Sequence, residues 1–137
     1  MSFVLDASVA ASLFLPDEES ETARSILGGA GGSILVPTLF WYEMASILSA
    51  SVRKGRLGEG PAFRALEMLR RLGLKVDARP IEELLPAIFM LSREHELSSY
   101  DSAYLELAAR EGATLCSHDG ELRAAAKKIG LSLLPAA

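Results

Sequence analysis

Short apolar segments alternate with longer helical patterns along this chain of 137 residues. We predict strands at the apolar segments, which are three to five residues long: 3–5, 33–36, 74–78, 113–116 and 131–134. Between them stand amphipathic helical patterns, in most cases two in succession. Strands separated by helices form parallel sheets that are covered on both faces. The order of elements therefore predicts an α/β protein, a three-layer α/β/α structure with a central parallel sheet of about five strands.

Composition places the chain among ordinary globular proteins. Half of its residues are apolar and 23% are charged, so disorder is excluded, and we expect residues 1–137 to form a single domain. The one cysteine, Cys116, lies in a predicted strand and fits a reducing compartment. The first residues lack the basic region of a signal peptide, and no stretch reaches the roughly 18 apolar residues of a spanning helix. We therefore expect a soluble, cytoplasmic protein that makes no membrane contact.

Charge is unevenly distributed along the chain. Residues 53–79 hold eight basic and three acidic side chains, so this segment carries +5 whereas the whole chain carries −4. An acidic body with a basic middle is compatible with a polyanion held beside a metal-loaded acidic pocket. A solvated helical face explains the same residues equally well, and both interpretations stay open.

Four acidic residues stand at places where chemistry is expected: Asp6, Glu43, Asp101 and Asp119. In an α/β fold, ligands bind where strands end and helices begin. Asp6 and Asp119 precede helical patterns and Asp101 lies three residues after Ser98, so helix capping is an adequate explanation for each of these three. Glu43 is different, because it lies one turn inside an apolar helical pattern with no basic residue three or four positions away.

Convergence of these four acids would require a cation. Two carboxylates about 4 Å apart repel each other by roughly 4 kcal/mol at an effective dielectric constant near 20. Oxygen ligands without His or Cys favour Mg²⁺ or Mn²⁺ over zinc. Such an ion, when bound, supplies an activated water and neutralises charge on a phosphate, which suits phosphodiester cleavage without a covalent nucleophile. Ser8, two residues after Asp6, is a candidate hydrogen-bond donor to that carboxylate, and a place on the helix surface explains it equally well.

Four blocks lie in order along nearly the whole chain, at residues 4–9, 42–45, 100–105 and 117–122. They resemble the signature blocks of PIN-domain ribonucleases, most closely those of the VapC-type toxins of prokaryotic toxin–antitoxin pairs. Each block alone is a weak signal, but four at similar spacing are a strong one. Pro86 departs from the pattern, because it falls in a helix that is usually free of proline.

This resemblance implies a PIN-like domain and a metal-dependent ribonuclease, a hydrolase that cleaves RNA phosphodiester bonds with Mg²⁺ or Mn²⁺. It further implies a homodimer and a cognate protein antitoxin that blocks the site. Asp6, Glu43, Asp101 and Asp119 match the acidic catalytic and metal-site residues, and Ser117 matches a hydroxyl residue that supports them.

Two other functions remain as alternatives. A receiver-like Mg²⁺ phosphotransfer domain also places acids at strand ends, but it needs a lysine near the last strand, and residues 131–134 contain none. A catalytically silent PIN module that only binds RNA or protein is the second alternative, and the presence of all four acids argues against it.

Aromatic residues near the acids receive packing roles in this interpretation. We expect packing rather than base stacking for Phe40, Trp41 and Tyr42, and we place Tyr100 and Tyr104 in the core because they share a helical face. His118, although it precedes Asp119, and His95 are given no catalytic role.

Overall fold

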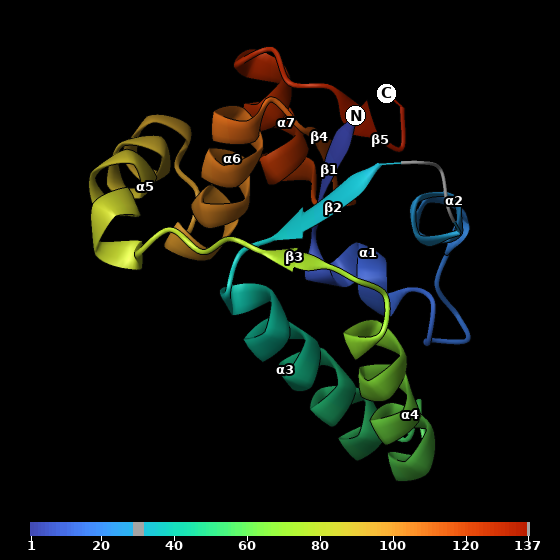
Figure 1. The fold of residues 1–137 in the computed structure, drawn as a ribbon. Helices are drawn as coiled ribbons and strands as arrows, with labels where there is room; N and C mark the ends of the chain where they lie inside the picture. Colours follow the sequence, from blue (N-terminus) through green and yellow to red (C-terminus); the bar gives the residue numbers. More distant parts are fainter. Residues whose placement is uncertain (29–31, 137) are drawn as a thin grey trace.

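A five-stranded parallel sheet forms the centre of the computed structural model, which describes residues 1–28 and 32–136 (Figure 1). Its strands are β1 (Ser2–Leu5), β2 (Ser33–Val36), β3 (Lys75–Val76), β4 (Thr114–Cys116) and β5 (Leu133–Leu134). They lie in the order β3-β2-β1-β4-β5, and every neighbouring pair is parallel. The predicted fold class is therefore confirmed. The edge strands β3 and β5 are shorter than predicted. An edge strand pairs on one side only, and in each of these two strands only two residues pair with the neighbouring strand.

Seven helices connect these strands within the described residues. They are α1 (Ala7–Ala11), α2 (Glu21–Leu27), α3 (Leu39–Arg53), α4 (Glu59–Arg70), α5 (Ile81–His95), α6 (Ser99–Glu111) and α7 (Gly120–Lys128). The sequence pattern predicts that the first helix ends at Leu15, but the helix ends earlier, at Ala11. Residues 12–14 form turns instead; in one of them the N–H of Phe14 donates to the carbonyl of Ala11 (2.9 Å). Helix α5 begins at Ile81 and contains Pro86, so the proline does not delay its start.

Alternating side chains of β1 join two different cores on the two faces of the sheet. Phe3 and Leu5 belong to a core completed by α1, α2, α3 and α4. Val4 belongs to a second core, completed by α6 and α7. Helix α5 lies farther out and packs on α6, through Leu84, Ile88 and Ala103. Figure 1 shows the two helical layers on opposite sides of the strands.

The strand order reverses between β1 and β4. From β1 the chain moves to β2 and then to β3, whereas β4 lies on the other side of β1 and leads to β5. In open α/β sheets the crevice beside the carboxyl ends of the strands at such a switch point is the usual ligand site. The two strand ends are tied together here, because the N–H of Asp6 donates to the carbonyl of Cys116 (3.0 Å).

An ion-pair junction joins the end of β3 to α6. Arg110 donates from Nη2 to Asp77, the residue after β3, and from Nε to Glu106 (3.0 Å). The side chains are 17%, 13% and 9% exposed for Arg110, Asp77 and Glu106. The two neighbouring carboxylates raise the pKa of the Arg110 guanidinium, so the junction stays charged.

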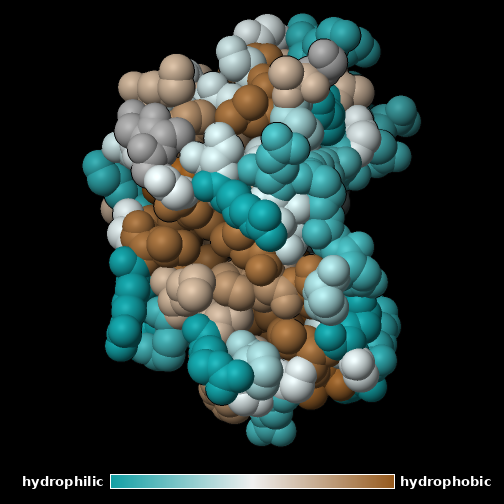
Figure 2. Space-filling model, turned by 90° about the vertical axis from the view of Figure 1, so that its right-hand side faces the viewer, coloured by the Kyte–Doolittle hydropathy of each residue, from teal (hydrophilic) through white to brown (hydrophobic). Residues whose placement is uncertain are grey.

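The face of the molecule in Figure 2 carries a broad apolar band, drawn in brown. On α4, Phe63 is 64% and Met68 54% exposed. A hollow of about 310 Å³ lies between α3 and α4, lined in part by Leu48, Val52 and Phe63. None of the helices described by the structure combines the length and apolar character needed to cross a bilayer.

Candidate active site

Asp6 lies at the carboxyl end of the central strand, and only 8% of it is exposed. It is the N-cap of α1 and accepts a hydrogen bond from the N–H of Ser8 (3.4 Å). Its Oδ2 accepts from the hydroxyl of Ser117 (2.8 Å) and from the hydroxyl of Ser8 (3.2 Å). Of the two alternatives for Ser8, the structure has the hydrogen bond to Asp6, and Ser117 binds the same carboxylate.

Ser117 connects two of the acids across the switch point. Besides donating to Asp6, its Oγ accepts from the N–H of Asp119 (3.1 Å), so one fully buried hydroxyl links the end of β1 to the turn after β4. Asp119 itself caps α7, because its carboxylate accepts from the N–H of Leu122 (3.3 Å). Arg123, one turn into α7, donates to the carbonyls of Ser117 (2.9 Å) and Pro135 (2.8 Å) and fixes this turn from outside.

Asp101 and Glu43 come from helices on opposite sides of the sheet. Asp101 stands in the first turn of α6, where its N–H donates to the cap residue Ser98 (3.1 Å). Glu43 stands on the second turn of α3 and is half-buried. Its Oε1 accepts a 2.6 Å hydrogen bond from the hydroxyl of Tyr104 in α6. The two helices are thus joined at the site by one hydrogen bond.

Repulsion between the carboxylates indicates that the four acids lie near one another. Burial raises the pKa of Asp6, and repulsion from Asp119 adds to this, while the serine hydrogen bonds oppose it. Burial raises the pKa of Glu43, and the charges of Asp6 and Asp101 raise it further, whereas the hydrogen bond from Tyr104 lowers it. Burial is the main cause that raises the pKa of Asp101, and repulsion from Asp119 and Asp6 raises it further. Side chains far apart in the chain therefore share one acidic site.

The donor set fits a hard divalent cation, since all four acids offer carboxylate oxygens and no thiol or imidazole stands among them. Within the described residues, no group of three or more His, Cys, Asp or Glu side chains is placed to hold a metal ion as it stands. Magnesium usually keeps several waters, so it reaches some protein oxygens through water rather than directly. The chemistry of the residues therefore fits such an ion, whereas their spacing requires bridging waters or small side-chain movements.

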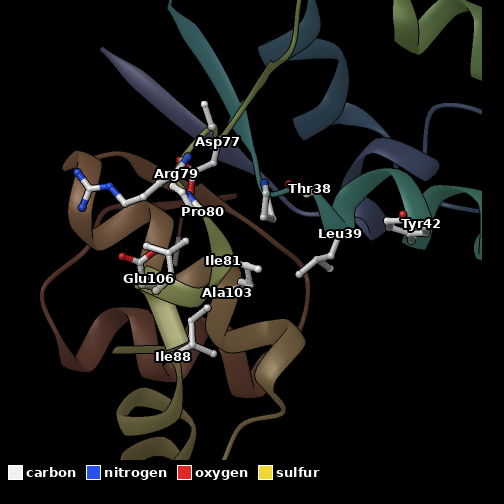
Figure 3. Close-up of a pocket in the computed structure, with 13 residues that line it drawn as sticks. Thr38, Leu39, Tyr42, Asp77, Arg79, Pro80, Ile81, Ile88, Ala103 and Glu106 are labelled. Carbon is white, nitrogen blue, oxygen red and sulfur yellow. The ribbon is translucent and has the colours of Figure 1, made fainter. Parts of the chain in front are cut away.

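A shallow hollow opens beside the acids. It has a volume of about 390 Å³ and is lined by Asp6, Glu43 and Ser8 together with Ala7, Tyr42, Ser46 and Ile47. A second hollow, of about 430 Å³, shares Tyr42 with it and contains none of the four acids. Figure 3 shows this second hollow, between the start of α3, the start of α5 and the side of α6. Its two carboxylates, Asp77 and Glu106, are the ones bound by Arg110, so the acidic hollow is the candidate site.

Some of the aromatic residues near the site are buried and others are exposed, and this differs in part from the prediction. Phe40 is fully buried and Trp41 packs edge-on against it, with ring centroids 5.3 Å apart, as expected. Tyr100 is 64% exposed, so placing it in the core was wrong. Tyr42 is 75% exposed and does not pack within this chain as Phe40 and Trp41 do. Both stand beside site acids on the outer side of their helices, where no layer covers them. Tyr104 is buried as predicted, but its hydroxyl makes the contact with Glu43 that packing alone did not reveal.

Neither histidine enters the site. His118 is on the surface, with Nε2 3.9 Å from a carboxylate oxygen of Glu19. His95 lies at the end of α5, 3.8 Å from Glu94. The roles of Arg123 and Tyr104 were missed from sequence. The spacing of three residues from Asp101 to Tyr104, which puts both on one helical face, was a usable signal for the tyrosine.

The fold and the site together define an α/β protein with an acidic cluster at the carboxyl edge of a parallel sheet. The model of the PIN domain family matches residues 3–128. The chain belongs to the PIN-domain family. This assignment removes the receiver-like alternative.

Within this family the chain is similar to VapC proteins. It is 34% identical to ribonuclease VapC3 of Pyrobaculum aerophilum over 122 residues, which are 89% of this chain and 92% of that protein. The crystal structure of PAE2754 from the same organism superposes with a TM-score of 0.70 at 26% identity, covering 98% of this chain and 92% of the other. VapBC2 from Rickettsia felis, solved with a DNA fragment from its promoter, has a TM-score of 0.67 at 17% identity and covers 97% of each chain, which shows the fold alone. The VapC-type resemblance is thereby confirmed.

Proposed function

We propose that this protein is a Mg²⁺- or Mn²⁺-dependent endoribonuclease that cleaves RNA phosphodiester bonds as the toxin of a toxin–antitoxin pair. The acidic site at the carboxyl edge of the sheet carries this proposal. Asp6 and Glu43 line the same hollow, and repulsion from Asp119 raises the pKa of both Asp6 and Asp101. The similarity to a VapC ribonuclease over 89% of the chain supports RNA as the substrate.

Each acid has a separate means of being held in place. The Asp6 carboxylate is oriented by Ser117 and Ser8, and that of Glu43 by Tyr104. Asp101 and Asp119 stand at the starts of α6 and α7, where the positive ends of the helix dipoles stabilise their charges. A divalent ion at these carboxylates supplies an activated water and neutralises charge on the scissile phosphate. The role of the protein is then to preorganise oxygens around the place where that charge develops.

Two protein partners belong to this proposal. The likeness to VapBC2 from Rickettsia felis supports a cognate antitoxin, which we propose covers the acidic site. We further propose that the chain forms a homodimer. Two helices expose apolar side chains that offer surface for two such contacts. They are Phe63 and Met68 on α4, and Leu85, Phe89 and Met90 on α5. A toxin that acts on cellular RNA would work in the cytoplasm.

Replacing Asp6 with Asn tests the proposal directly. The change removes one charge and keeps the size and an acceptor oxygen for Ser117, so the protein should stay folded, while RNA cleavage and growth inhibition are lost. Asp17→Asn is the matched control, because Asp17 is an exposed acid that pairs with Arg56 and with none of the four site acids, and it should keep both activities. Cleavage by the wild type should stop when EDTA is added and return with Mg²⁺ or Mn²⁺.

The silent-module alternative gives a different set of results. A protein that only binds RNA or protein would show no metal-dependent cleavage in the wild type. Toxicity that survives Asp6→Asn would likewise contradict the nuclease, because the most buried of the four acids would then be dispensable. Sedimentation of the purified chain, alone and with the co-expressed antitoxin, measures the two proposed assemblies.

A further inference from the structure

Tyr104 is a buried residue whose polar atom is directed at the acidic site. Only 1% of the residue is exposed, and its ring belongs to the core formed by β1, β4, α6 and α7. Its hydroxyl donates to Oε1 of Glu43, a residue 61 positions earlier in the chain, at 2.6 Å. The distance is typical of a strong hydrogen bond from a hydroxyl to a carboxylate.

Helix α6 delivers this hydroxyl and a site acid from the same face. Tyr104 follows Asp101 by three residues, so the two side chains are neighbours on the helix surface. Glu43 arrives from α3, on the other side of the sheet. The contact between Tyr104 and Glu43 therefore sets the position of the α3 acid relative to the α6 acid.

The two partners differ in how freely they move. A glutamate has three rotatable side-chain bonds and loses much rotamer freedom when it is fixed, whereas a buried tyrosine ring is already held by its packing. The hydrogen bond occupies Oε1 of Glu43 and so restricts the movement of the carboxylate, while Oε2 remains for a ligand. Without the bond, the half-buried Glu43 carboxylate would turn away from Asp6 and Asp101, which repel it.

We propose that Tyr104 is a positioning residue that holds the Glu43 carboxylate toward the divalent cation. The inference rests on the proposed function, because it assumes that Glu43 is a ligand of that ion. Partners that orient a ligand in this way typically contribute about 10-fold or more to metal affinity or activity. A purely structural tyrosine would instead contribute to packing and leave the affinity for the ion unchanged.

The test compares two identical substitutions on the same helix. Tyr104→Phe removes the hydroxyl that binds Glu43, whereas Tyr100→Phe removes a hydroxyl from a residue that is 64% exposed. Mn²⁺ binding to each purified variant is measured by calorimetry without RNA, at a temperature where circular dichroism shows both to be folded. We expect Tyr104→Phe to weaken Mn²⁺ binding about 10-fold and Tyr100→Phe to leave it unchanged. In cleavage assays kcat should fall for Tyr104→Phe, with KM for RNA unchanged.

A third variant separates positioning from packing. In a Glu43→Gln background, Tyr104→Phe should weaken Mn²⁺ binding no further, since the charged ligand that it positions is already gone. Equal Mn²⁺ affinity in Tyr104→Phe and Tyr100→Phe would overturn the inference and leave the proposed function intact. A wild-type protein that binds no Mn²⁺ would overturn the metal site and this inference together.

Discussion

Ser117 illustrates how much of the site depends on single side chains. It is fully buried, and its one hydroxyl both donates to Asp6 and accepts from the N–H of Asp119. No other residue contacts both acids through the same atom among the hydrogen bonds of the described residues. The hydroxyl therefore holds two carboxylates near each other although they repel.

Replacing Ser117 with Ala should destabilise the protein. The change leaves the buried Asp6 carboxylate and the partly buried N–H of Asp119 each short of a partner, and such losses cost roughly 1–3 kcal/mol. Urea denaturation without divalent ions measures the free energy of unfolding. Ser8→Ala is the matched control, since its hydroxyl binds the same Oδ2 at 3.2 Å from a less buried position. Equal losses in the two variants would contradict the bridging role of Ser117.

For single residues, the sequence indicates which side chains belong to the candidate site better than it indicates how buried they are or what they contact. The motif blocks and the strand ends point to all four acids and both serines, and their roles in the site stay predictions. Tyr100 and Tyr104 share a helical period, yet one is exposed and the other is buried. Periodicity shows which residues share a face, but the width of the covering layer decides how far burial extends along it. Contacts across 61 residues, such as Tyr104 to Glu43, are visible only after folding.

Among the elements, α5 contains a departure from the family pattern. Pro86 stands sixth in a helix of 15 residues, past the first turn in which proline is well tolerated. Its missing N–H leaves the carbonyl of Glu82 without the usual helical donor. The helix nevertheless continues to His95, so packing of Leu84 and Ile88 on α6 outweighs this loss.

Pro86→Ala should therefore stabilise the protein. Restoring the helical hydrogen bond and relieving the ring contact should add on the order of 1–3 kcal/mol, reduced by the greater freedom of the unfolded chain. Pro61→Ala is the control, because Pro61 stands third in α4, where no intrahelical hydrogen bond is lost. Thermal unfolding should show a higher melting temperature for the Pro86 variant alone. A lower melting temperature would mean that Pro86 is required by its surroundings.

The Arg110 junction is the second prediction at the scale of elements. Arg110→Ala leaves the carboxylates of Asp77 and Glu106 mostly buried and without their cation, a change that costs about 3 kcal/mol in comparable pairs. Arg56→Ala breaks exposed pairs with Asp17 and Glu18 and should cost less than about 1 kcal/mol. Denaturant titration compares the two. Similar losses would show that burial of the junction contributes little.

The positions of the elements were largely predictable, and their ends were not. Five apolar segments and the helices between them were located because the buried strands of a parallel sheet are apolar and short. The strand order could not be read from the chain, since β1 pairs with both β2 and β4, about 30 and 110 residues away. That order places the end of β1 beside the end of β4, and so it brings Asp6 to Ser117 and Asp119. The single domain over residues 1–137 stays a prediction.

For the whole molecule, Cys116 offers a reporter of global unfolding. It lies in β4, between β1 and β5, and it is fully buried. Burial raises the pKa of its thiol to about 12, so in the folded protein the thiol stays protonated at neutral pH and even at pH 9. Only the thiolate reacts with disulfide reagents. Reaction therefore requires an opening that both exposes the sulfur and restores its ordinary pKa.

Labelling with an aromatic disulfide should consequently follow unfolding of the central sheet. In the native protein at pH 8 we expect labelling roughly 1000-fold or more slower than in the urea-unfolded chain, because native domains are stable by at least about 5 kcal/mol. The strongly destabilised Arg110→Ala should label faster than the wild type, with the logarithm of the labelling rate rising in proportion to the lost free energy of unfolding, and Pro86→Ala should label more slowly. Rapid labelling of the wild type would show that β4 opens locally. The acids at both ends of the Asp6–Ser117–Asp119 connection would then be held by a mobile strand, which is incompatible with a preorganised site.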